Sequence, residues 1–181
     1  QSLRHKEVSM KGRRKGFSLI ELLLVLVVAT GIAGATFYGY SKLQEGFRTS
    51  NAIRDLATIS KAMNAITASK PTIAEANSML ISSKSLPSTM VDTRTNTLVN
   101  AYGGKLTITA HNGLDDSYDV SFYNVPPSAC STLVSSGRVV YRNISNTTSG
   151  SKIAATSSMA DITAFCSSFN TSSVLVFTNA D

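Results

Sequence analysis

Apolar side chains dominate one stretch of the chain, which begins at Phe17 and continues to Tyr40. Glu21 is the only charged residue among these 24 positions. A helix of this length can span the roughly 30 Å of hydrocarbon in a bilayer. A basic cluster precedes the stretch and consists of Lys11, Arg13, Arg14 and Lys15. Because basic clusters resist transfer across a membrane, the pattern predicts a spanning helix whose N-terminal flank stays in the cytoplasm.

The apolar stretch continues into an amphipathic segment, residues 41–69. Apolar side chains recur there at three- and four-residue spacing, which is typical of a helix with one buried face: Ile53, Leu56, Ile59 or Ser60, Met63 and Ile66. Pro71 ends the pattern. We therefore predict one helix over residues 17–69, about 80 Å long at 1.5 Å per residue. Residues 17–40 form its membrane-spanning half, residues 41–70 its amphipathic half, and residues 71–181 a globular domain.

The globular part alternates short helical and extended patterns, which predicts an α+β fold with an antiparallel β-sheet. We expect a short helix over 73–81 and a polar, turn-rich segment over 82–100. We expect strands at 105–110, 117–124, 139–144 and 173–178, with a loop or hairpin turn at 111–116 and a loop at 146–151. Ser128 is expected to cap a helix that ends at Gly137. Ser158 and Asp161 form a capping box for a helix that reaches Phe169.

The net charge of +6 belongs mostly to the N-terminus. Residues 1–16 carry six of the 17 Lys and Arg residues and one of the 11 Asp and Glu residues. The remaining chain, with 11 basic and 10 acidic residues, is almost neutral. The basic balance therefore indicates membrane topology, and we predict no direct nucleic-acid binding.

Cys130 and Cys166 are the only cysteines. The predicted topology places both outside the cytoplasm, where disulfides persist. We expect a disulfide that links two short helices across the sheet and stabilises the fold by about 3–4 kcal/mol in the loop-entropy model. Two buried free thiols are the alternative. A metal site is not expected, because too few cysteine and histidine ligands are present.

The start of the apolar stretch resembles the processing site of type IV prepilins. In that family a short basic leader ends in Gly, and a hydrophobic residue and a fifth-position Glu follow the cut. Gly16, Phe17 and Glu21 fit this pattern. The resemblance implies that a membrane-embedded prepilin peptidase removes the leader, residues 1–16, and N-methylates Phe17. The chain starts at Gln1, and a start at Met10 would give a shorter leader.

Two other kinds of N-terminal segment remain as alternatives. A secretory signal peptide usually has 7–15 apolar residues followed by a small-residue cleavage site. In this chain the apolar stretch is longer and Gly16 lies before it. An uncleaved signal-anchor helix is the other alternative.

The order of features after the long helix is similar to that of type IVb pilins. It comprises Asn-x-x-Gly-Gly at 100–104, strands, Ser-Ala-Cys at 128–130, a late cysteine and a terminal strand. Bundle-forming, toxin-coregulated and conjugative thin-pilus pilins belong to that subfamily. The resemblance implies a pilin fold, in which the second half of the long helix packs on the sheet.

Glu21 is the central candidate for assembly. A carboxylate within a spanning helix costs about 2.5–3.5 kcal/mol near the centre and less near an end. Cleavage would expose an amine at Phe17, in the same chain or in a neighbouring subunit, that could neutralise Glu21. An intermolecular pair would fix the axial register of an incoming subunit. The alternative is a glutamate tolerated near the membrane surface.

We do not expect an enzyme or a cofactor. The chain has two histidines, His5 and His111, and no Gly-rich phosphate loop before a helix. An acidic turn formed by Asp115, Asp116 and Asp119 could bind Ca²⁺, but it lacks the EF-hand pattern and a solvated turn explains it more simply.

The predicted function is that of the major subunit of a type IVb pilus. The precursor is expected in the bacterial inner membrane, and the processed subunit is expected in a pilus at the cell surface. Expected partners are other copies of the chain, the prepilin peptidase, the inner-membrane assembly machinery and, before assembly, membrane lipid. A minor pilin or a type II secretion pseudopilin is the nearest alternative, and a membrane-tethered periplasmic binding domain is a more distant one.

Overall fold

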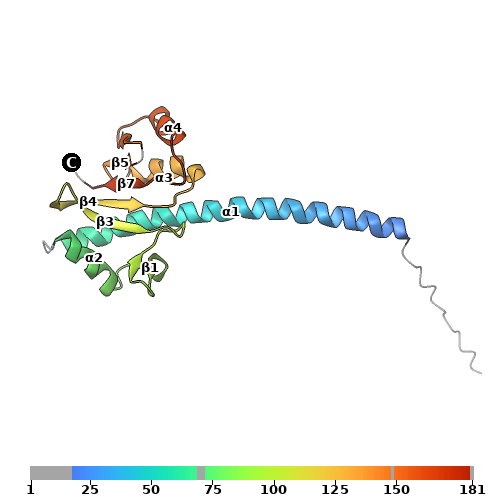
Figure 1. Cartoon of the computed structure of the whole chain (residues 1–181), viewed down its shortest axis with the longest axis horizontal. Coiled ribbons are helices and arrows are strands. Elements are labelled where there is room, and N and C mark those ends of the chain that lie inside the picture. Colours follow the sequence, from blue (N-terminus) through green and yellow to red (C-terminus); the bar gives the residue numbers. More distant parts are fainter. Residues whose placement is uncertain (1–17, 69–71, 148, 180–181) are drawn as a thin grey trace, which may run out of the picture. The chain divides into compact units, whose positions relative to one another are not determined.

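The computed structural model describes residues 18–68, 72–147 and 149–179. It divides into two units, residues 1–42 and 43–181. One helix, α1 (Leu19–Thr67), begins in the first unit and ends in the second (Figure 1). The remaining helices are α2 (Ile73–Ser82), η1 (Ser88–Met90), η2 (Pro127–Ala129), α3 (Cys130–Gly137) and α4 (Met159–Ser167). The strands are β1 (Val91–Asp92), β2 (Thr97–Leu98), β3 (Leu106–His111), β4 (Leu114–Phe122), β5 (Asn143–Asn146), β6 (Lys152–Ala154) and β7 (Leu175–Thr178).

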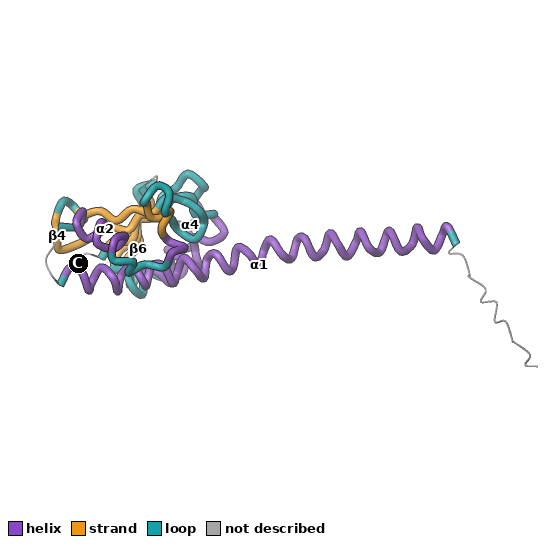
Figure 2. The backbone as a smooth tube through the Cα atoms, turned by 90° about the horizontal axis from the view of Figure 1, so that it is seen from below, coloured by secondary structure: helices purple, strands orange, loops and turns teal. Residues whose placement is uncertain are grey.

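The second unit is built around a five-stranded antiparallel sheet in the order β3-β4-β7-β5-β6. The last strand of the chain, β7, lies in the middle of this sheet, and all four of its residues are buried. Phe177 of β7 is opposite Val120 on one side and Ile144 on the other. Figure 2 shows the strands gathered beside the C-terminal part of α1. The predicted α+β architecture is therefore confirmed.

The buried face of α1 is the one that the spacing predicts. Leu56, Ile59 and Met63 are at most 1% exposed, and Ala52 extends the same stripe by one turn. Tyr141 packs against this stripe, and its hydroxyl donates to the backbone carbonyl of Leu56 at 3.1 Å. Apolar burial and this hydrogen bond hold the second half of α1 on the sheet.

Several short-range predictions are confirmed. The helix expected at 73–81 is α2, which has a capping box between Thr72 and Glu75. The predicted capping box of Ser158 and Asp161 starts α4, although this helix ends at Ser167, before Phe169. The alternating pattern of Tyr118, Val120 and Phe122 in β4 places all three side chains in the core.

The predicted turn at 111–116 is shorter than expected. Asn112 and Gly113 reverse the chain, with φ angles of 51° and 75° that favour asparagine and glycine. Strand β4 already begins at Leu114, so Asp115, Asp116 and Asp119 belong to a strand. The predicted acidic turn is wrong, because two residues suffice to close this hairpin.

The predicted cap at Ser128 is also wrong. Pro126 and Pro127 start the 3-10 turn η2, so Ser128 lies inside that turn and α3 has no side-chain cap. The Ser128 hydroxyl instead donates a hydrogen bond to the carboxylate of Glu45 on α1. A residue that appears to cap the helix thus joins the turn to the long helix.

The strand predicted at 139–144 begins later, at Asn143. The amides of Val140 and Tyr141 both bond to the carbonyl of Gly137, which continues the chain as turns after α3. Val139 is left 84% exposed, whereas Tyr141 is buried. Burial of the tyrosine on α1 decides this geometry, which local β-propensity cannot anticipate.

Two extended elements lie where the sequence predicts no strand. Strands β1 and β2 form a small hairpin within residues 82–100. Strand β6 follows the loop expected at 146–151 and pairs with β5. Their two or three residues each are too short to give a periodic pattern.

Gly104 lies where no side chain fits. A Cβ atom there would overlap the backbone carbonyl oxygen of Tyr123. We therefore expect Gly104→Ala to destabilise the second unit by about 2 kcal/mol or more. Urea unfolding of the full chain in detergent, followed by tyrosine near-UV circular dichroism, measures this change.

Gly46→Ala is the matched control for Gly104→Ala. A Cβ at Gly46 meets no atom within 4 Å, and the position is helical. The control should leave stability unchanged or raise it by about 0.5–1 kcal/mol. Equal unfolding midpoints for the two variants would show that the predicted clash is absent.

Candidate functional site

The N-terminal half of α1 exposes a long, mostly apolar surface. Leu19 is 78% exposed and Phe37 is 82% exposed, and the large aliphatic side chains between them are more than half exposed. Among the described residues, α1 is the one helix long and apolar enough to cross a membrane. So much exposed apolar surface requires either lipid or other protein surfaces around it.

Glu21 lies in the first turn of α1 and its side chain is exposed. The helix macrodipole favours a carboxylate at this end. Within the described residues, Glu21 has no hydrogen bond or ion pair through its side chain. Its predicted partner, the Phe17 amine, and the predicted cleavage site at Gly16 lie outside the described residues. Pairing and cleavage therefore stay predictions.

A polar contact on α1 lies just beyond the exposed apolar half. Thr49 is 7% exposed, and its hydroxyl accepts a hydrogen bond from the Tyr102 hydroxyl at 3.1 Å. Burial raises the pKa of Tyr102, and the negative charges of Glu45 and Asp55 raise it further. The two carboxylates on α1 therefore both act on the same tyrosine.

The turn that carries Tyr102 is held by Asn100, which is 3% exposed. Its side-chain oxygen accepts from the amides of Tyr102 and Gly104, and its amide donates to the Tyr123 carbonyl at 2.7 Å. The sequence indicates a turn here through the Asn-x-x-Gly-Gly pattern. It does not indicate that the turn holds an aromatic side chain against α1.

Asp55 is half-buried on α1, and burial raises its pKa from 3.8 to about 6. Between these two pH values the folded chain holds a proton that the unfolded chain has lost, so stability falls as pH rises through this interval. Asp55→Asn should therefore stabilise the chain above about pH 6.5 and have little effect near pH 3.5. Solvent screening limits the gain to about 1 kcal/mol. Unfolding midpoints across pH test this.

Asp92→Asn is the control, and we expect it to change the stability of the chain in the opposite direction. The Asp92 carboxylate accepts a hydrogen bond from the Arg94 amide, which lowers its pKa. The stability that this bond contributes is present at neutral pH and is lost as pH falls, so Asp92→Asn should destabilise the chain at neutral pH. A shift of the same sign for both variants would contradict the assignment of Asp55.

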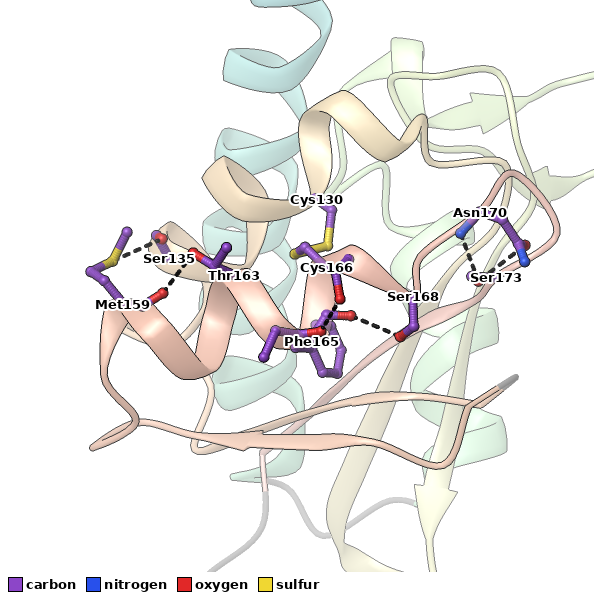
Figure 3. The surroundings of a disulfide bond; sticks show 11 residues. Cys130, Ser135, Met159, Thr163, Phe165, Cys166, Ser168, Asn170 and Ser173 are labelled. Atoms are coloured by element: carbon purple, nitrogen blue, oxygen red, sulfur yellow. Dashed lines mark hydrogen bonds between the residues drawn. A yellow bond between two sulfur atoms is a disulfide. The ribbon is translucent and has the colours of Figure 1, made fainter.

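The predicted disulfide is confirmed. Cys130 is the first residue of α3 and Cys166 lies near the end of α4, with their Cα atoms 5.8 Å apart (Figure 3). The helices α3 and α4 are direct neighbours, so the bridge joins adjacent helices and does not cross the sheet. The Ser135 hydroxyl also contacts the Met159 sulfur at 3.8 Å, which links the other ends of the two helices.

Asp119 is engaged within the sheet. Its carboxylate contacts Nδ1 of His111 at 3.0 Å and accepts a hydrogen bond from the Thr178 hydroxyl at 2.6 Å. In the part of the chain that the structure describes, no group of three potential metal ligands comes together. The polar cluster therefore links strands β3, β4 and β7.

The chain matches two family models. The model described as PilS N terminal matches residues 45–180, and that of the prokaryotic N-terminal methylation motif matches residues 11–36. The major structural subunit of the bundle-forming pilus from Escherichia coli O127:H6 is 24% identical over 129 residues, which cover 70% of this chain and 67% of that protein. The corresponding subunit from Escherichia coli O111:H- matches equally.

Two crystal structures share the fold. TcpA, a type IV pilin from the Vibrio cholerae El Tor biotype, has a TM-score of 0.55 and 13% identity, covering 74% of this chain and 99% of that chain. A type IV b pilin from Salmonella typhi has a TM-score of 0.55 and 18% identity, and the match covers 71% of this chain and 97% of that chain. Together with the family match over most of its length and the N-terminal methylation motif, these findings show that the chain belongs to the PilS N-terminal family and is a type IV prepilin.

Proposed function

We propose that this prepilin is the major structural subunit of a type IVb pilus. The observation that carries the proposal is the exposed apolar surface of α1 from Leu19 to Tyr40, in which Glu21 is the only charged residue. Such a surface is stable in a bilayer before assembly and among the helices of other subunits afterwards. During assembly, the α1 helices of other copies of the chain therefore replace the lipid around this surface.

Processing is the first step of this proposal. Prepilin peptidase cleaves between Gly16 and Phe17 and methylates the new amine of Phe17. The match to the N-terminal methylation motif over residues 11–36, which include both residues, supports this step. The basic leader keeps this site at the cytoplasmic face of the inner membrane until the cut is made.

Glu21 selects the register of the incoming subunit. In a dry bundle of α1 helices an unpaired carboxylate is strongly unfavourable, and so is an unpaired amine. Both charges are neutralised when Glu21 of one subunit meets the Phe17 amine of a neighbour. Because few axial offsets bring these groups together, the assembly machinery adds each subunit at a defined height.

The assignment as the major subunit draws on the Escherichia coli relatives, which are major structural subunits of bundle-forming pili. The second unit, residues 43–181, then forms the filament surface. It carries the contacts of the pilus in adhesion, aggregation or conjugation.

The test is the composition of filaments sheared from the native host. We expect this chain to be the most abundant protein in the sheared fraction, and deletion of its gene to remove the filaments. Trace amounts in filaments built from another pilin would assign it as a minor pilin. Retention in the membrane with residues 1–16 attached would identify a tethered domain.

A further inference from the structure

Two large apolar side chains of α1 stay exposed beyond residues 17–40. Leu43 is 63% exposed and Phe47 is 69% exposed, although both belong to the second unit. Among the described residues of α1, Phe47 is the last large apolar side chain that is exposed. Residues four positions apart are neighbours on a helix surface, so the two side chains form one patch on one face of α1.

The rest of the second unit contacts the opposite face of this part of α1. The Glu45 carboxylate accepts a hydrogen bond from the Ser128 hydroxyl. The Thr49 hydroxyl accepts one from the Tyr102 hydroxyl at 3.1 Å. Glu45 and Thr49 each lie two positions from Phe47, which places them about 160° around the helix from it. The domain therefore leaves the patch of Leu43 and Phe47 uncovered.

The patch is within reach of a membrane–water interface. The apolar stretch ends at Tyr40, and Phe47 follows it by about 10 Å of helix at 1.5 Å per residue. The headgroup layer extends about 5–7 Å beyond the hydrocarbon on each side of a bilayer. Helical side chains point back toward the N-terminus, and spanning helices incline by about 20° on average. Both effects bring the Phe47 ring toward the layer in which aromatic side chains gather.

The charges beside the patch fit an anionic lipid surface. Lys42 and Arg48 are exposed and flank it, and Arg54 is exposed on the same face, seven positions beyond Phe47. The acidic residue between Lys42 and Arg54 is Glu45, which is engaged with the second unit on the opposite face. Attraction of exposed cations to lipid phosphates adds to the gain from burying the apolar side chains.

We infer that Leu43 and Phe47 insert into the outer interface of the bilayer before assembly and form a lipid contact beyond the spanning half of α1. Lipid is the occupant because the patch continues the apolar surface that ends at Tyr40, and because cations flank it. The second unit is then held at the membrane surface by the face of α1 that it leaves uncovered. This inference rests on the part of the proposed function that places α1 in a bilayer.

Single-tryptophan variants of the full chain test this contact, because the chain itself contains no tryptophan. Phe47→Trp is reconstituted in vesicles of phosphatidylethanolamine and phosphatidylglycerol whose acyl chains carry bromine, a fluorescence quencher, either near the headgroup or near the chain end. We expect a blue-shifted emission that the shallow bromines quench more strongly than the deep ones. Lys61→Trp is the matched control, since Lys61 is exposed about 21 Å further along the helix, and neither set of bromines should quench it.

Ile32→Trp separates failure of the inference from failure of the proposed function. Ile32 is 61% exposed within residues 17–40, so the deep bromines should quench this variant most strongly. Quenching of Ile32→Trp without quenching of Phe47→Trp would overturn the inference alone. A blue-shifted but unquenched Phe47→Trp would show that a second copy of the chain covers the patch, which also overturns it. If neither variant is quenched, α1 does not occupy the bilayer, and the proposed function is contradicted.

Discussion

Replacing Glu21 with alanine is expected to reduce surface filaments at least about a hundredfold, because removing one partner of a buried charge pair costs about 3–5 kcal/mol. The Phe17 amine would then enter the dry core of the filament without a counter-charge. Membrane insertion should persist, since the substitution makes α1 more apolar. Removal of residues 1–16 should also persist. Immunoblots of sheared and membrane fractions measure filament yield and processing together.

Two further substitutions separate charge from shape at this position. Glu21→Gln keeps the length and polarity of the side chain but not its charge, so it should fail like alanine. Glu21→Asp keeps the charge and should retain part of the assembly. Normal filament yield from Glu21→Ala would show that the glutamate is merely tolerated at the membrane surface.

Loss of the disulfide is the second large effect that we expect. The bridge spans 36 positions, which corresponds to roughly 4 kcal/mol in the loop-entropy model. This is a large part of the 5–15 kcal/mol that typically stabilises a domain. The Cys130→Ala/Cys166→Ala variant should therefore unfold at a much lower urea concentration than the wild type. Urea unfolding of the full chain in detergent measures the difference.

A reductant provides the control for the cysteine variant. Reduction should lower the unfolding midpoint of the wild type to near that of the double variant, and should leave the variant itself unchanged. If the variant and the oxidised wild type unfold together, packing of α3 against α4 stabilises this region without the bridge.

The parts of the fold that the sequence predicts well are those with a repeating local signal. The spacing of Leu56, Ile59 and Met63 defines the buried face of α1, and the alternation in β4 defines its core side. The capping box at Ser158 correctly predicts the residue at which α4 starts. In each case neighbouring positions along the chain determine the structure, so tertiary contacts do not override the pattern.

The predictions that fail concern positions governed by distant partners. Ser128 resembles a helix cap, but its hydroxyl binds Glu45, 83 positions earlier. Val139 and Val140 favour a strand, but Tyr141 is drawn onto α1 and the chain continues as turns. A sequence pattern carries no information on which remote group will compete for a side chain.

The candidate site divides in the same way. Gly16, Phe17 and Glu21 are recognised from a short contiguous motif, and the two cysteines pair because no other thiol is present. The groove between α1 and the turn at residues 99–103, which Asp55 lines, has no such signal. Its walls come from α1 and from a turn about 45 residues later in the chain, and only the fold brings them together.

The most direct test of the central claim is mass spectrometry of the N-terminal peptide of this chain in filaments sheared from the native host. The account predicts a peptide that begins at Phe17 and is one methyl group heavier than its sequence requires. Processing and assembly would then be established on the same molecules. A chain found only in the membrane fraction, with residues 1–16 still attached, would contradict the account.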